Sequence, residues 1–101
     1  MDSPVPYRVS YSERVRNELR ALIIKAQDRG LGRQVLDAAK EMDRRLRIYP
    51  QFGQPLKDLT LESGQVWIGV VAPLVVRYAL YEDRRIVMVA APTMPLPHLG
   101  L

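Results

Sequence analysis

Arginine is the side chain in this sequence that is best suited to binding an anionic ligand. The chain has a formal net charge of +4, and most of its basic residues are arginines. A guanidinium donates paired hydrogen bonds to a phosphate or a carboxylate. There is no cysteine and one histidine, His98, which excludes thiolate chemistry, disulfides and a Cys/His metal cluster. We therefore expect RNA, DNA or an acidic protein as the partner, with neither a metal nor a cofactor.

The length and composition favour one folded domain. A chain of 101 residues is close to the commonest domain size. Hydrophobic residues make up 48% and charged residues 26% of the chain, which is ordinary for a globular protein. The first residues lack a basic segment followed by an apolar stretch, and no run approaches the roughly 18 apolar residues of a membrane-spanning helix. We expect a single cytoplasmic domain over residues 1–101 that does not enter a membrane.

Two helices are predicted in the N-terminal half of the chain. Ser12 suits the N-cap of a helix, and Gly30 stands where a left-handed residue would end that helix. The second helix must stop near Ile48, because two prolines follow closely. Two helices joined at Gly30–Gly32 therefore form a hairpin. The apolar residues at helical spacing are Val15, Leu19, Leu22, Ile23 and Ala26 in the first helix and Leu31, Val35, Ala38, Ala39, Met42 and Leu46 in the second.

Strand patterns stand on either side of the helices. Val5–Tyr11 alternates with period two. The segment Tyr49–Pro55 predicts a loop that continues to about Gly64. Three apolar runs, 66–71, 74–81 and 86–91, then form an antiparallel meander. The predicted fold class is α+β, a two-layer domain of order β-α-α-β-β-β in which the helical hairpin packs on an antiparallel sheet. Residues 92–101 hold three prolines and are expected to form an extended tail.

This order of elements resembles the RelE/ParE toxin superfamily. The resemblance also includes Tyr7–Ser12 before the first helix, Tyr49–Leu59 before the meander, and the hairpin Val75–Val89, and it covers residues 5–91. It implies a toxin of a type II toxin-antitoxin pair, of the plasmid stabilisation type, that a cognate antitoxin protein neutralises. RelE-like members cut mRNA on the ribosome, and ParE-like members poison DNA gyrase.

The resemblance places Arg77 at the phosphate-binding strand arginine of the family, so Arg77 is the candidate catalytic residue. RNA cleavage also needs a positioned base and acid, each contributing about 10²- to 10⁴-fold in rate. The family's lysines are absent from residues 66–70, and Pro92–Pro97 replaces its basic, tyrosine-containing segment. The incomplete set predicts weak RNA cleavage at best and favours the gyrase-directed route. The alternative is that Arg77 is merely solvated or pairs with Glu82 or a helix carboxylate.

Lys57, Arg84 and Arg85 are the candidates for contact with nucleic acid or with another target. Each adds positive charge in a predicted loop or turn, where simple solvation is the alternative. His98 would act as an acid or base near neutral pH, or it is a surface histidine in the proline-rich tail. The charged residues 40–47 would touch nucleic acid or an acidic antitoxin, or they form a solvated helix face with pairs such as Glu41 and Arg45.

Three aromatic residues of the meander allow two interpretations. Trp67, Tyr78 and Tyr81 would form a platform on which bases stack. The competing interpretation, which we favour, is that Trp67 and Tyr78 fill the core beneath the helices.

The sequence leaves three functions open. The first is a toxin, with the gyrase-directed route preferred over ribosome-dependent mRNA cleavage. The second is a non-toxic member of the same fold that binds proteins through its tail or a sheet edge. The third is simple nucleic-acid binding, whose affinity would fall with salt. Whether the chain is an enzyme is open as well.

Overall fold

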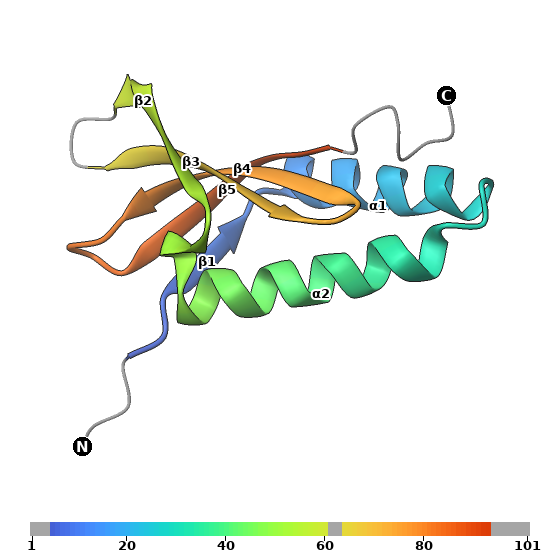
Figure 1. The fold of residues 1–101 in the computed structure, drawn as a ribbon, viewed down its shortest axis with the longest axis horizontal. Coiled ribbons are helices and arrows are strands. Elements are labelled where there is room, and N and C mark those ends of the chain that lie inside the picture. The colour runs from blue at the N-terminus through green and yellow to red at the C-terminus, as the bar shows by residue number, and fades with distance from the viewer. Residues whose placement is uncertain (1–4, 61–63, 94–101) are drawn as a thin grey trace.

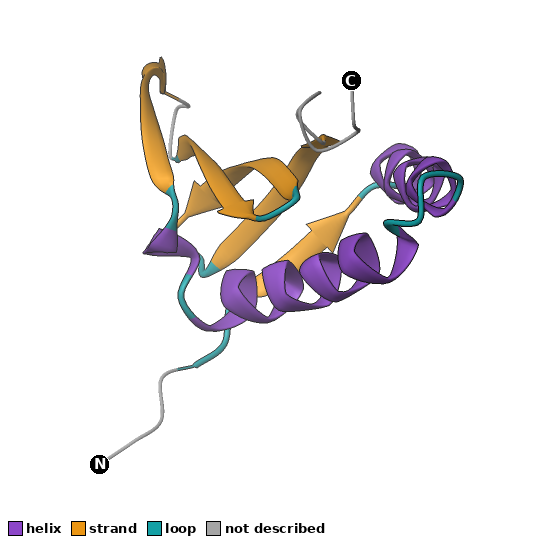
Figure 2. Ribbon diagram, turned by 45° about the vertical axis from the view of Figure 1, so that its right-hand side comes forward, coloured by secondary structure: helices purple, strands orange, loops and turns teal. Residues whose placement is uncertain are grey.

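Two helices lie on one side of a five-stranded sheet in this computed structural model, which describes residues 5–60 and 64–93 (Figures 1 and 2). The strands are arranged in the order β1-β5-β4-β3-β2, so β4 is the central strand. The elements are β1 (Arg8–Tyr11), α1 (Glu13–Gln27), α2 (Gly32–Ile48), a 3-10 turn η1 (Pro50–Phe52), β2 (Gln54–Thr60), β3 (Gln65–Val71), β4 (Leu74–Tyr81) and β5 (Ile86–Thr93).

The helical hairpin forms as the sequence predicts. The Ser12 side-chain oxygen accepts a hydrogen bond of 3.1 Å from the Val15 amide and caps α1. Gly30 turns the chain between the helices with a φ of 74°, a left-handed conformation that costs glycine little. Among the described residues, neither helix is long and apolar enough to cross a membrane.

The sheet differs from the prediction in its topology. β1 pairs with β5 in parallel, with Arg8 beside Ile86, so the sheet is mixed and not wholly antiparallel. Residues 54–60 form β2, although the sequence predicted a loop there. Pro55 is tolerated because β2 is an edge strand, and an edge strand can lack one donor. The first strand begins at Arg8 and not at Val5.

The last strand also runs further than predicted. β5 extends to Thr93 and includes Pro92, which pairs with Val76 of β4. β1 pairs with β5 only as far as Val89. At Pro92 the edge of β5 that faces away from β4 is therefore not paired with β1, and the backbone N–H that proline lacks is not needed there. The rest of the predicted tail lies outside the described residues.

The core lies between the helices and the facing side of the sheet. Tyr78 is fully buried, and Trp67 is partly buried and packs against the same core, which confirms the prediction for these two residues. Burial beneath the helices makes them unsuitable as a platform for bases. The larger cluster of buried core residues contains Val9, Val15, Ala38, Met42, Leu46, Leu74, Val76, Tyr78, Leu80, Val87 and Val89. Ala26 and Val35 form a second, smaller cluster between the two helices.

Candidate functional site

Arg77 lies on the face of the sheet that the helices leave uncovered. Side chains alternate between the two faces along a strand, and Val76 and Tyr78 on either side of Arg77 are buried in the core. Arg77 itself is exposed. Its register partners are Ile68 of β3 and Ala91 of β5. These two residues, with Val75 and Arg77, line a hollow of about 300 Å³.

Arg77 forms no ion pair with any side chain that the structure describes; the side chains of residues 57–60 are outside that set. The ion pairs seen within α1 and within α2 each join residues one turn apart on the same helix. Glu82, the neighbour that the sequence suggested as a partner, instead accepts a hydrogen bond of 2.8 Å from the Gln51 side chain. The guanidinium of Arg77 is therefore exposed to solvent and is not neutralised by a described carboxylate.

Apolar side chains surround Arg77 on the same face. An antiparallel sheet with one solvated face normally alternates apolar residues on the core side with polar residues on the outer side. Here most outer positions of β3 and β4 are apolar as well, and Val70 of β3 and Met88 of β5 keep 55% and 48% of their surface exposed. Sequence reasoning did not single out this surface, although the unbroken apolar runs of the meander are its signal. We call it the outer face, with Val66, Ile68, Val70, Val75, Arg77, Ala79 and Met88 as its members.

The other predicted contact residues do not join Arg77. Arg85 stabilises the N-terminal segment, because its guanidinium donates a hydrogen bond of 3.0 Å to the Val5 carbonyl and lies 5.3 Å from the Tyr7 ring centre. Arg84 is exposed in the same turn. That turn follows Tyr81, which is four residues, or about 13 Å of strand, beyond Arg77.

Two further candidate residues, Lys57 and His98, have side chains that the structure does not describe. Lys57 belongs to β2, but its side chain lies outside what the structure describes. His98 lies outside the described residues altogether.

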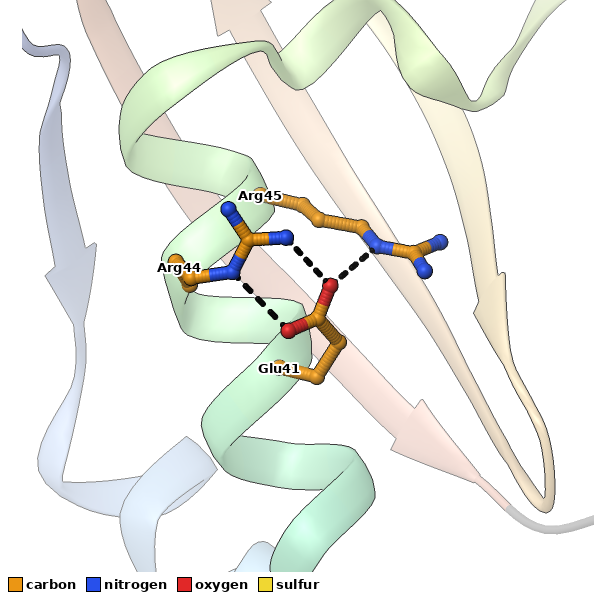
Figure 3. A network of polar contacts seen from close by, with 3 residues as sticks. All are labelled: Glu41, Arg44 and Arg45. Carbon is orange, nitrogen blue, oxygen red and sulfur yellow. Dashed lines mark hydrogen bonds and ion pairs between the residues drawn. The ribbon is translucent and has the colours of Figure 1, made fainter.

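The charged side chains of α2 mainly pair with one another. Glu41 accepts hydrogen bonds from Arg44 at 2.6 and 2.9 Å and from Arg45 at 2.7 Å (Figure 3). The Arg44 hydrogen bonds, followed by those of Arg45, lower the pKa of Glu41 to about 2. This arrangement agrees with the solvated helix face that the sequence offered as one interpretation.

Asp43 of α2 connects the helix to the strand β1 by a hydrogen bond. It accepts hydrogen bonds of 2.8 Å from Arg47 and 2.6 Å from the Tyr11 hydroxyl. Burial by itself raises the pKa of Asp43, but the hydrogen bonds from Arg47 and Tyr11 outweigh burial and lower it. Burial of Tyr11 raises the pKa of its hydroxyl, and the hydrogen bond to Asp43 and the negative charge of Asp43 raise it further.

We expect acid to destabilise the fold by protonating the carboxylates of Glu41 and Asp43. A carboxylate whose pKa is lower in the folded state stabilises the protein above its unfolded pKa and loses this effect as the pH falls toward the folded value. For Glu41 the window runs from 4.5 down to about 2. The expected loss of stability is modest, since exposed ion pairs are screened by solvent. Urea unfolding across this window measures it.

The matched variants for this measurement are Glu41→Gln and Asp37→Asn. Glu41→Gln flattens the loss of stability in acid, because the group that binds the extra proton is gone. Asp37 is 64% exposed and 3.7 Å from Arg33, so Asp37→Asn leaves the pH dependence almost unchanged. If Glu41→Gln lost stability in acid as the wild type does, Glu41 would not be the group responsible for that loss.

The described residues form no metal site, and comparison with known proteins does not identify a family for the chain. No three His, Cys, Asp or Glu side chains of residues 5–60 and 64–93 are grouped closely enough to hold a metal ion. No protein-family model matches the chain, and no curated protein matches it significantly. The RelE/ParE resemblance therefore stays a prediction from the sequence.

Proposed function

We propose that this chain is the toxin of a type II toxin-antitoxin pair and that it stops growth by binding a protein target. The observation that carries the proposal is the position of Arg77, an exposed cation without an ion-pair partner among the described side chains. It lies on the central strand of a sheet face that the helices leave uncovered and that is largely apolar. Exposed apolar patches on a folded domain mark sites of protein interaction. A ParE-like, gyrase-directed route follows from the family resemblance, with a cognate antitoxin as the physiological inhibitor.

The surroundings of Arg77 argue against RNA cleavage. Transfer of the 2′-hydroxyl proton and protonation of the leaving oxygen both need a titratable group near the phosphate. The hollow beside Arg77 is lined by Ile68, Val75 and Ala91, none of which can accept or donate a proton. Among the described residues, the lining of this hollow therefore favours binding of an anion by Arg77 over catalysis.

The direct test is controlled induction of the chain in a bacterial culture. We expect the wild type to arrest growth and Arg77→Ala to restore it. An arginine at the centre of an interface typically contributes 2 kcal/mol or more, which corresponds to about 30-fold in affinity. Arg84→Ala is the matched control, because it removes an exposed arginine of the same hairpin outside the outer face, and it should arrest growth as the wild type does.

Two further readouts separate the possible outcomes. Primer extension on cellular mRNA should show no new cleavage sites during arrest, whereas DNA breaks or loss of supercoiling would accompany a gyrase-directed effect. New mRNA ends that vanish in Arg77→Ala would establish the ribonuclease instead. Unimpeded growth with abundant folded protein would contradict the toxin and leave a non-toxic binding protein of the same fold.

A further inference from the structure

The outer face is more apolar than a sheet face in contact with water normally is. Both helices lie on the opposite side of the sheet (Figure 2), and the residues that alternate with the core positions of β3 and β4 are mostly Val, Ile and Ala. A strand that faces water on one side ordinarily places polar residues there. The exposed Val70 and Met88 of this face are therefore available to pack against a partner.

Among the side chains that the structure describes, the positive charge near the centre of the outer face belongs to Arg77. Arg77 occupies the central strand, and the hollow at its side is formed by apolar residues of the three middle strands. Arg8 is another cation on this face among the described side chains, but it pairs with Ile86 in the edge strand β1. Ile86 pairs with Tyr81, which is about 13 Å along β4 from Arg77. Among the described side chains, Arg77 is therefore the cation that a ligand at the hollow would meet.

This distribution distinguishes a protein from a nucleic acid. Interfaces with nucleic acids are polar and strongly positive, since several cations must neutralise successive phosphates. Interfaces between proteins combine an apolar centre with a few charged groups, and arginine is enriched among them. One arginine inside an apolar surface matches the second pattern.

We infer that the outer face binds a protein segment that places one carboxylate on Arg77 and apolar side chains on both sides of it. The inference rests on the proposed function and specifies the chemistry of the partner at the same face. The guanidinium and the carboxylate form paired, charge-assisted hydrogen bonds, while the flanking apolar side chains cover Ile68, Val75 and Ala91. An acidic Asp or Glu side chain between apolar residues on one face of a strand or helix has this form.

Labelled model peptides test the inference directly. One is extended, Val-Ser-Val-Ser-Glu-Ser-Val-Ser-Val, with its valines and glutamate on the same face. The other is helical, with leucine three residues before and four residues after a glutamate. We expect at least one to bind the full chain, by fluorescence anisotropy, about tenfold or more tightly than its Glu→Gln form.

Exchange of the charges identifies Arg77 as the partner of the glutamate. Arg77→Ala should abolish the difference between the Glu and Gln peptides, and Arg77→Glu should prefer a peptide with lysine in place of glutamate. Arg84→Glu, which changes the net charge by the same amount outside the outer face, should keep the preference for glutamate. Equal losses in Arg77→Glu and Arg84→Glu would reveal general charge attraction and overturn the inference.

The remaining outcomes separate this inference from the proposed function. If neither peptide binds better than its Gln form, the inference fails, while growth arrest that depends on Arg77 still supports a toxin. If a labelled single-stranded RNA binds more tightly than either peptide and Arg77→Ala removes that binding, the outer face recognises nucleic acid. Peptide binding without growth arrest supports the inference and contradicts the toxin.

Discussion

Tyr78→Ala is expected to destabilise this protein more than any other single change to an aromatic side chain. Tyr78 is fully buried, and its ring is stacked on that of Phe52 with 6.5 Å between the ring centres. Removing a buried aromatic side chain typically costs about 3–5 kcal/mol, out of a total stability of about 5–15 kcal/mol for a small domain. In a domain of this size such a loss lowers Tm by about 15–30 °C.

The smaller change Tyr78→Phe isolates the hydroxyl group. That hydroxyl donates a hydrogen bond to the Pro50 carbonyl, which connects the central strand to the turn η1. Tyr78→Phe leaves a buried carbonyl without this partner, at a cost of about 1–3 kcal/mol. Tyr49 is 59% exposed, so Tyr49→Ala should change stability by about 0.5 kcal/mol or less. Thermal unfolding of the three variants should therefore rank them clearly, and equal effects of Tyr78→Ala and Tyr49→Ala would refute this account of the core.

Local patterns explain why the helices and the antiparallel meander of β3, β4 and β5 were predictable, whereas the pairing of β1 and the existence of β2 were not. A cap at Ser12, a turn at Gly30 and apolar residues at helical spacing all act within a few residues. The pairing of β1 with β5 joins Arg8 to Ile86 across most of the chain, and no nearby residue encodes whether that pairing is parallel. The strand β2 was hidden by Pro55 because prolines usually indicate loops, although an edge strand accepts one.

The candidate site was predictable only in part, for the same reason. Arg77 stands out because it interrupts an apolar run, but its lack of an ion-pair partner within the described chain depends on where every carboxylate folds. Arg85 has the same charge and exposure, yet its guanidinium donates to the Val5 carbonyl, 80 positions away. The sequence made Arg77 the candidate catalytic residue and Arg85 a candidate contact residue, but it could not show that the fold gives Arg85 a structural role.

Gly53→Ala is expected to damage both the fold and the outer face. A methyl group at this position would collide with the backbone carbonyl oxygen of Ile68 and lie 2.6 Å from the Tyr78 hydroxyl oxygen. Neither atom can yield easily, since Ile68 belongs to the paired strand β3 and the Tyr78 hydroxyl is bonded to Pro50. Overpacking of this kind costs about 1–3 kcal/mol.

The effect should reach Arg77 because the displaced residue is its neighbour. Ile68 pairs with Arg77 across β3 and β4 and lines the same hollow, so a shift of its backbone reshapes the surface beside the guanidinium. We expect Gly53→Ala to unfold at lower urea concentration, to move the amide NMR signals of Ile68 and Arg77, and to weaken growth arrest.

Gly32→Ala provides the matched control for Gly53→Ala. Its methyl group would meet mainly the exposed, flexible side chain of Gln27, which can move aside, and alanine favours a helix over glycine by about 1 kcal/mol. Gly32→Ala should therefore be as stable as the wild type or more so and should keep its activity. If both alanine variants were equally stable and equally active, the close approach at Gly53 would not support the outer face, and the position of Arg77 would depend on the β3–β4 pairing alone.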